Sequence, residues 1–250
     1  MTKSKAFLKN TVVVVFWLLV WQVLASLANR NLIIPIPTFF DTVKTLFLIG
    51  GTKEFLLSAL MSFLRIGAGF VLAVAAGCVC AVLSAYIPPF RALFEPLLKI
   101  IRAVPVASFI MLVFLWLERG TIPTFISFLT VLPIVWANVL EGISKTDKKL
   151  IEMASVMGLK KPRIIKKIVI GGVKPYFTTA AATGLGFAWK SGAAAEVICR
   201  TGNSLGEILW RGKSDVNYNE VFAVTAVIII LSILLENGIR LILERGNSHD

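Results

Sequence analysis

The sequence predicts an all-α protein that crosses a membrane several times. Hydrophobic residues make up 57% of the 250 positions, which is too many for a water-soluble domain. Several apolar runs are long enough to cross about 30 Å of hydrocarbon as helices. These runs lack the alternation of apolar and polar residues that strands of a membrane barrel require. The prediction is therefore a polytopic integral membrane protein built from helices.

Six apolar runs are the predicted membrane spans of a single domain over residues 1–250. They are residues 12–28, 58–86, 97–117, 122–143, 176–199 and 221–243, with a connecting loop at 144–174. The first run follows three lysines and could be taken for a signal peptide. Its length and its two tryptophans favour an uncleaved span instead.

Basic residues are distributed unevenly among the connections between spans. The net charge is +12, and nine Lys and Arg residues fall in Lys145–Lys174, whereas Arg119 is the single basic residue between spans three and four. Basic loops stay on the cytoplasmic side of a membrane. We therefore expect both termini and Lys145–Lys174 in the cytoplasm and residues 202–219 outside. Membrane topology thus accounts for the charge without a nucleic-acid partner.

The loop after the fourth span predicts a short helix that docks on a partner protein. Ser144 and Asp147 have the spacing of a capping box. An apolar stripe follows on one helical face, at Leu150, Met153, Ala154 and Met157. A capped amphipathic helix in a cytoplasmic loop leaves an apolar face to be covered.

A second helix is predicted after a tight break. Gly158 can take the left-handed conformation that closes a helix, and Pro162 suits the first turn of the next one. Gly171 and Gly172 are expected to end this second helix before the fifth span begins near residue 176.

This loop resembles the E-A-A-x3-G-x9-I-x-L-P signature of permease subunits in binding-protein-dependent ABC importers. The sequence departs from it at Met153, Ile170 and Gly171, which replace the first Ala, the Leu and the Pro. In that family the loop docks on a cytoplasmic ATPase subunit. The resemblance assigns this docking to Glu152, Met153, Ala154, Met157, Gly158 and Ile168.

Other stretches resemble the nitrate, sulfonate and taurine group of these importers. They are the proline turn at residues 35–38 with a short interfacial helix after it, Arg65-x-x-x-Gly69, and Arg102-x-x-Pro105. From the residue alone, Arg65 is interpreted as snorkelling toward the headgroups. Around residues 205–210 a second short helix is expected to lie on the external surface.

The resemblance also implies the partners and the location. It implies two copies of an ABC ATPase, a second permease subunit in a homodimer, an external substrate-binding protein, and the lipid of a bacterial plasma (inner) membrane. No cofactor is implied. The chain is not expected to be an enzyme, because Gly212-Lys213-Ser214 ends like a phosphate-binding loop but has Glu207 where the first glycine is needed.

Five residues in spans three to five are candidates for the translocation pathway. They are Pro105, Asn138, Gly184, Lys190 and Gly192. The two glycines belong to a face of small residues that lets helices approach closely or lines a passage. A charge inside a span rarely faces lipid, so Lys190 is expected to face the pathway or a subunit interface.

The fifth span contains two charged residues, Lys190 and Glu196, whose roles the sequence leaves open. Glu196 is expected to pair with Arg200, four residues on.

Lys190 and the resemblance favour a small anion as the substrate, such as a sulfonate or nitrate, although the group includes importers of vitamin precursors. The alternative function is an ion-coupled secondary transporter that uses Lys190 and Glu196, although no internal repeat supports it. Cys78, Cys80 and Cys199 have no metal-site spacing.

Overall fold

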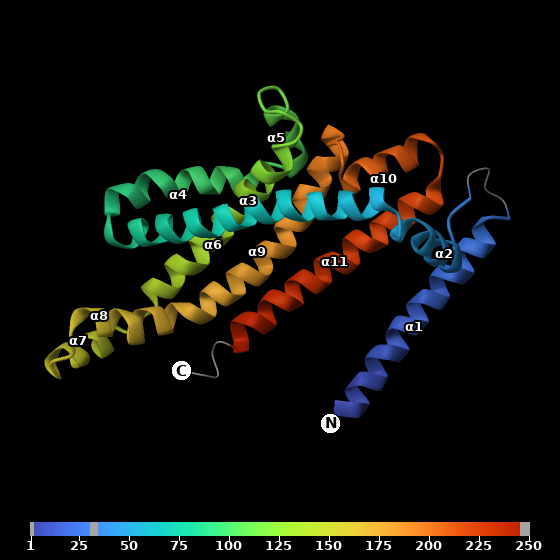
Figure 1. The fold of residues 1–250 in the computed structure, drawn as a ribbon. Helices are drawn as coiled ribbons and strands as arrows, with labels where there is room; N and C mark the ends of the chain where they lie inside the picture. The colour runs from blue at the N-terminus through green and yellow to red at the C-terminus, as the bar shows by residue number, and fades with distance from the viewer. Residues whose placement is uncertain (1–2, 31–34, 246–250) are drawn as a thin grey trace.

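The computed structural model describes residues 3–30 and 35–245, which form helices and connecting segments only (Figure 1). The helices are α1 (Lys3–Ala28), α2 (Phe39–Gly50), α3 (Lys53–Tyr86), α4 (Pro88–Ala103), α5 (Val106–Val113), α6 (Ile122–Ser144), α7 (Lys148–Val156), α8 (Lys161–Ile164), α9 (Ile170–Cys199), α10 (Leu205–Ser214) and α11 (Tyr218–Arg245). A π-helical segment, η1 (Ile165–Val169), joins α8 to α9. The predicted all-α class is confirmed.

Several of these helices can cross a membrane. Within the described residues, α3, α6, α11 and the part of α1 after Thr11 are long and apolar enough to do so, and α4 with α5 makes a fifth, bent candidate. Helix α9 occupies the place of the predicted fifth span and is 30 residues long. Its many small and hydroxyl residues leave it less apolar than the others. The molecule is therefore a polytopic membrane protein.

The predicted third span, residues 97–117, is not one straight helix. Helix α4 begins earlier, at Pro88, and lies along α3 (Figure 1). It ends at Ala103, and α5 leaves the break at an angle of 102°. Pro105 caps α5, and Val104 before it has an extended conformation with ψ of 131°. A residue before proline avoids the helical region, so this proline breaks the predicted span.

The core is formed by α3, α6 and α9, with α11 packed against α9 (Figure 1). Two glycines bring α3 close to α6. A Cβ on Gly69 would collide with the Thr124 carbonyl oxygen, and one on Gly77 would lie 2.8 Å from Val135 Cβ. In lipid, helices associate through van der Waals contact rather than the hydrophobic effect, so this close approach stabilises the pair.

Helix α1 stands apart from this core (Figure 1). It is attached near its C-terminal end, where Trp21 Nε1 donates to the Pro37 carbonyl (3.2 Å) and the Trp21 ring lies 6.0 Å from the Phe222 ring. Most large apolar side chains between Val12 and Leu27 are exposed in the single chain. Lipid or another subunit must cover them.

Both short helices predicted in the connections are present, and each has a side-chain cap. Thr38 and Asp41 form a capping box at the start of α2. Ser204 accepts a hydrogen bond from the Glu207 N–H at the start of α10 (2.9 Å). These caps fix where the two connecting helices begin.

Candidate functional site

The segment between α6 and α9 begins with a capped helix. The Lys149 N–H donates to Asp147 Oδ1 (2.8 Å), so Asp147 is the N-cap of α7. The predicted capping box is wrong, because Ser144 is still part of α6 and its hydroxyl donates to the Leu140 carbonyl (2.8 Å). Asp is as good an N-cap as Ser. With Asp147 in that role, α7 begins at Lys148, and Ser144 remains the last residue of α6.

A tight turn separates α7 from α8. Gly158 has φ of +75°, the left-handed conformation that the sequence predicts for it. The Leu159 N–H donates to the Ala154 carbonyl and the Gly158 N–H to the Ser155 carbonyl, each at 3.0 Å. Pro162 lies in the first turn of α8. These bonds satisfy carbonyls at the end of α7 and fix the direction of the reversal.

Most of the apolar face of α7 is exposed. Met153 is 59% exposed, Met157 78% and Val156 89%, and Leu150 is also exposed. Ala154 differs, since it is 5% exposed and buried within the turn. Of the other predicted docking residues, Glu152 is exposed and Ile168 is half-buried. An apolar stripe of four side chains therefore remains uncovered in the single chain.

The second helix does not end at Gly171 and Gly172, as the sequence predicted. Both glycines lie inside α9, and α8, η1 and α9 follow one another without a break from Lys161 to Cys199. Helices tolerate glycine at a cost of about 1 kcal/mol. The turn after α7 is therefore linked by continuous helix to the centre of the molecule.

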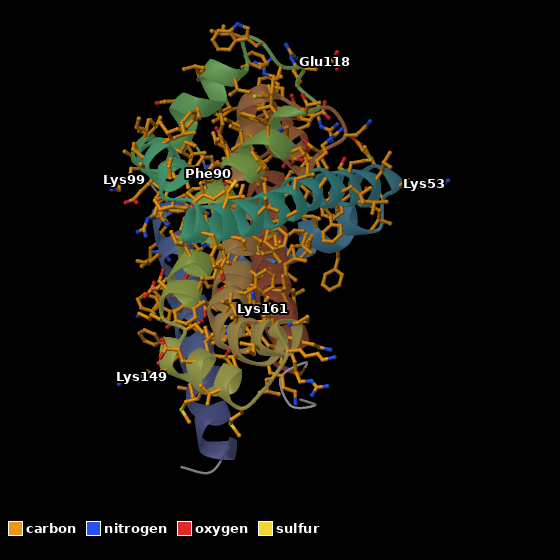
Figure 2. All side chains as sticks on the ribbon, turned by 90° about the vertical axis from the view of Figure 1, so that its left-hand side faces the viewer. Lys53, Phe90, Lys99, Glu118, Lys149 and Lys161 are labelled. Carbon is orange, nitrogen blue, oxygen red and sulfur yellow. The ribbon has the colours of Figure 1, made fainter. Side chains whose placement is uncertain are left out.

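The α7–α8 end of the molecule is basic and lies opposite the α5–α6 connection. Figure 2 shows Lys149 and Lys161 at one end and Glu118 at the other. Lys145, which caps α6, forms an ion pair with Glu141 (2.7 Å). The hydrogen bond to Glu141 raises the pKa of Lys145. Both side chains are more than half exposed, so the pair adds little stability.

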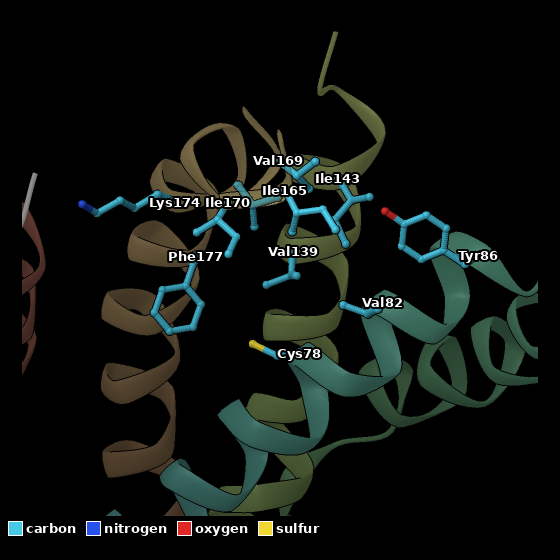
Figure 3. Close-up of a pocket in the computed structure, with 11 residues that line it drawn as sticks. Cys78, Val82, Tyr86, Val139, Ile143, Ile165, Val169, Ile170, Lys174 and Phe177 are labelled. Atoms are coloured by element: carbon cyan, nitrogen blue, oxygen red, sulfur yellow. The ribbon is translucent and has the colours of Figure 1, made fainter. Parts of the chain in front are cut away.

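An apolar pocket of about 690 Å³ lies where this segment joins the core (Figure 3). Cys78, Val82 and Tyr86 of α3 face Ile165 and Phe177 across it. Val139 and Ile143 of α6, with Val169, Ile170, Val173 and Lys174, complete the lining. Lys174 is the charged residue of this lining, and its ammonium group points away from the other lining side chains in Figure 3, so the pocket does not suit an anion.

Two pathway candidates of the fifth span are buried inside the single chain. A Cβ on Gly184 would lie 3.1 Å from Val131 Cγ1, and one on Gly192 would lie 2.6 Å from Ile66 Cγ1 and from Ser127 Oγ. The small-residue face of α9 thus lets α3 and α6 approach closely. It does not line an open surface of one subunit.

The opposite face of α9 is exposed and carries Thr179, Thr183, Phe187 and Lys190 at helical spacing. Two pockets open on this side. One, of about 270 Å³, is lined by Asn138, Glu141, Pro175, Tyr176 and Thr179. The other, of about 310 Å³, lies beside the α4–α5 break and is lined by Ile101, Arg102, Val104, Val106, Thr130, Pro133, Ile134, Thr183 and Phe187. Two candidates, Asn138 and Lys190, therefore lie on one side of the molecule, and exposed Pro105 lies at the adjacent break.

The expected ion pair between Glu196 and Arg200 is absent. Glu196 is fully buried, and its Oε2 accepts hydrogen bonds from Ser62 Oγ (2.7 Å) and from the Gly206 N–H (3.4 Å). Arg200 has a left-handed backbone, which directs its guanidinium onto the Trp210 ring at 3.5 Å. The two side chains do not meet on one helical face, because α9 ends at Cys199, before Arg200.

Arg65 binds the backbone of the α9–α10 connection. Its Nη1 donates to the carbonyls of Gly202 and Asn203, both at 3.1 Å. Together with the Ser62–Glu196 bond, this fastens the α9–α10 connection to α3. Lys190 and Glu196 lie on different faces of α9, one exposed and one buried, so they do not form the joint ion site that a secondary transporter would need.

Sequence reasoning missed the roles of four residues of these sites. Ser62 could not be identified, because nothing in its sequence context links it to a carboxylate 134 positions away. Thr130 and Thr183 look like ordinary polar residues of spans. Arg102 stands out in the sequence only as part of a proline motif, although a charge within a predicted span was a signal for it.

Residues 73–249 match the family of the binding-protein-dependent transport system inner membrane component. The match covers more than half of the chain, so the chain belongs to this family. It is an inner-membrane permease component of an ABC import system.

Curated relatives include permeases for several anions. The chain is 27% identical to the taurine transport system permease of Escherichia coli, over 91% of this chain and 84% of the relative. It is 26% identical to the nitrate import permease of Synechococcus elongatus, over 83% and 77%. It is also 26% identical to the putative aliphatic sulfonates transport permease of Bacillus subtilis, over 97% and 87%.

Solved structures agree on the fold. A crystal structure of an amino acid ABC transporter superposes with a TM-score of 0.65 at 15% identity, over 80% of this chain and 97% of that chain. A bacterial alginate ABC transporter, in complex with its alginate-bound periplasmic protein, superposes with a TM-score of 0.58 at 14% identity, over 95% and 93%. At this identity the likeness concerns the fold alone.

Proposed function

We propose that this permease carries a small oxyanion into the cell and is driven by a separate ATPase subunit that docks on α7. The observation that carries the proposal is the exposed apolar stripe of α7, which is Leu150, Met153, Val156 and Met157. Moving one such side chain out of water is worth about 1.5–3 kcal/mol. A partner groove that covers the stripe would gain much of this.

The helical connection supports coupling as well as docking. Asp147 fixes the start of α7, Gly158 fixes the turn, and α8 continues through η1 into α9. A displacement of α7 by an ATPase would therefore also move α9, because α8, η1 and α9 are continuous and no flexible linker between them absorbs the movement. In this proposal, ATP-driven closure of two ATPase subunits tilts α9 and the helices packed on it.

The other partners follow from the family. A second copy of the permease would complete the pathway, and an external binding protein would deliver the substrate. Both chain termini and α7 would lie in the cytoplasm, and α10 outside, because the basic residues gather at the α7–α8 end.

The substrate class is supported by the relatives and by the exposed charge on α9. The relatives are named for taurine, nitrate, aliphatic sulfonates and bicarbonate, and each of these carries an anionic oxygen group. Lys190 places a cation on the exposed face of α9. A cationic substrate would be repelled there.

Two charge variants of α7 test the docking. Met157→Glu places a carboxylate at the C-terminal end of the stripe, whereas Ser155→Glu places one on an exposed position across the helix. We expect the ATPase to co-purify with the Ser155 variant and to be lost from the Met157 variant, with equal membrane insertion of both. Undiminished co-purification with Met157→Glu would refute docking through this stripe.

A further inference from the structure

The pocket beside the α4–α5 break is more polar than the apolar pocket lined by Ile165 and Phe177. It encloses about 310 Å³, at the small end of the range typical of ligand sites. Its described lining contains one cation, Arg102, and two hydroxyls, Thr130 and Thr183, and no acidic residue. Such a lining suits a small anion and repels a cation.

The pocket lies at mid-depth in the helix bundle. Pro133 is near the middle of α6, and Thr183 is near the middle of α9. Arg102 lies in the last turn of α4, beside Pro133, and is exposed in the single chain. A charge at such a depth costs about 2.5–3.5 kcal/mol on insertion scales unless water or a partner compensates it.

Arg102 keeps most of its hydrogen-bonding capacity. Its Nη2 donates to the Pro133 carbonyl (3.2 Å), and the described residues provide it with no carboxylate. A guanidinium has five N–H donors in a planar fork that fits two oxygens of an anion. The single bond to Pro133 orients the fork and leaves its other donors for a ligand.

The two hydroxyls differ in availability. Thr130 Oγ1 already donates to the Ile126 carbonyl (2.9 Å) and contacts Ser191 Oγ (2.9 Å). Thr183 makes no hydrogen bond to another described residue and is exposed. Lys190 lies seven residues further along α9, about 10 Å away along the helix axis. A second cation therefore stands on the same face, toward the C-terminal end of α9.

We propose that the pocket at the α4–α5 break is the binding station for the transported oxyanion, held by the Arg102 guanidinium and the Thr183 hydroxyl. This inference rests on the proposed function and names the residues that recognise the substrate. The anion would enter past Lys190, pause at Arg102, and leave along the pocket of Asn138 toward the α7–α8 end.

Charge-selective labelling tests the site without knowledge of the substrate. Thr183→Cys, in a chain whose three native cysteines are replaced, is allowed to react with anionic ethylsulfonate and cationic ethylammonium methanethiosulfonates. The ratio of the two rates cancels any change in thiol reactivity. A positive charge within about 8 Å should shift that ratio by at least about fivefold toward the anionic reagent.

Arg102→Gln should lower this preference severalfold, to what the more distant Lys190 alone provides, and Arg102→Lys should retain it. The matched control is Arg91→Gln on the same helix, where an exposed pair with Glu95 (3.3 Å) is lost. A cysteine at Asn138, whose pocket contains Glu141, provides a comparison that leaves Arg102 in place. Its anionic preference should be lower than that at position 183.

An unchanged ratio in Arg102→Gln would overturn the proposal, as would an equal fall in Arg91→Gln. Equal ratios at positions 138 and 183 would overturn it even if Arg102→Gln failed to fold. Co-purification of the ATPase does not involve this pocket. Loss of the site and loss of the proposed function are therefore separate outcomes.

Discussion

Lys190 is the exposed charge on α9 whose role depends on what covers it. It forms no ion pair or hydrogen bond with the described residues, so its removal leaves no buried partner uncompensated. If it faces lipid, the charge costs about 2.5–3.5 kcal/mol on insertion scales for no gain. A position in the pathway avoids that cost through hydration and attracts the anion.

Lys190→Met keeps the length and the apolar stem while it deletes the charge. We expect anion uptake to fall, with unchanged protein yield and ATPase association, because the folded subunit makes no bond to this ammonium. Lys213→Met, on the exposed surface of α10, is the control and should leave uptake intact. Normal uptake by Lys190→Met would show that the charge serves neither substrate nor interface.

Local sequence patterns predicted Gly158 correctly but not the partner of Glu196. Gly158 was predictable because its left-handed conformation depends on immediate neighbours. The Glu196–Arg200 pair was predicted wrongly because α9 ends between the two residues and because Ser62 competes for the carboxylate. The sequence carries no local sign of a partner that a different helix supplies.

At the scale of elements, the packing of α3 on α6 depends on Gly69. A side chain there would meet the backbone of α6, which cannot move aside as a flexible side chain could. Gly67, two residues earlier on the same helix, has no atom within 4 Å of the position that a Cβ would take. A comparison of substitutions at Gly69 and Gly67 therefore separates the effect of packing from that of intrinsic helix propensity.

Gly69→Ala should lower the melting temperature of the purified protein, since overpacking costs about 1–3 kcal/mol. Gly67→Ala should leave it unchanged or raise it, because Ala favours helix over Gly by about 0.8–1.0 kcal/mol. Thermal unfolding in detergent measures both. Equal behaviour of the two variants would contradict the close contact between α3 and α6.

Element boundaries were less predictable than element types. Hydrophobic length located the long helices, but it could not show that Pro105 breaks the third span by 102° or that α9 runs on through Gly171 and Gly172. Proline and glycine each permit more than one outcome in a membrane helix. The surrounding helices decide which one occurs.

For the whole molecule, the distribution of charge predicts which end faces the cytoplasm. Ser155 on α7 and Ser214 at the end of α10 are both exposed and suit a conservative change to cysteine. In intact cells, an impermeant thiol reagent should label Ser214→Cys and spare Ser155→Cys until the membrane is opened. The reverse pattern would invert the topology and remove α7 from the cytoplasm.

The central claim is that this permease works in an ATP-driven importer and not as an ion-coupled carrier. The direct measurement is uptake of radiolabelled taurine, nitrate, sulfonate or bicarbonate into proteoliposomes that hold the permease with its cognate ATPase. We expect uptake of one of these anions to require both MgATP and the external binding protein, and to persist when ionophores dissipate ion gradients. Uptake that an ion gradient drives in the absence of ATP would contradict the account.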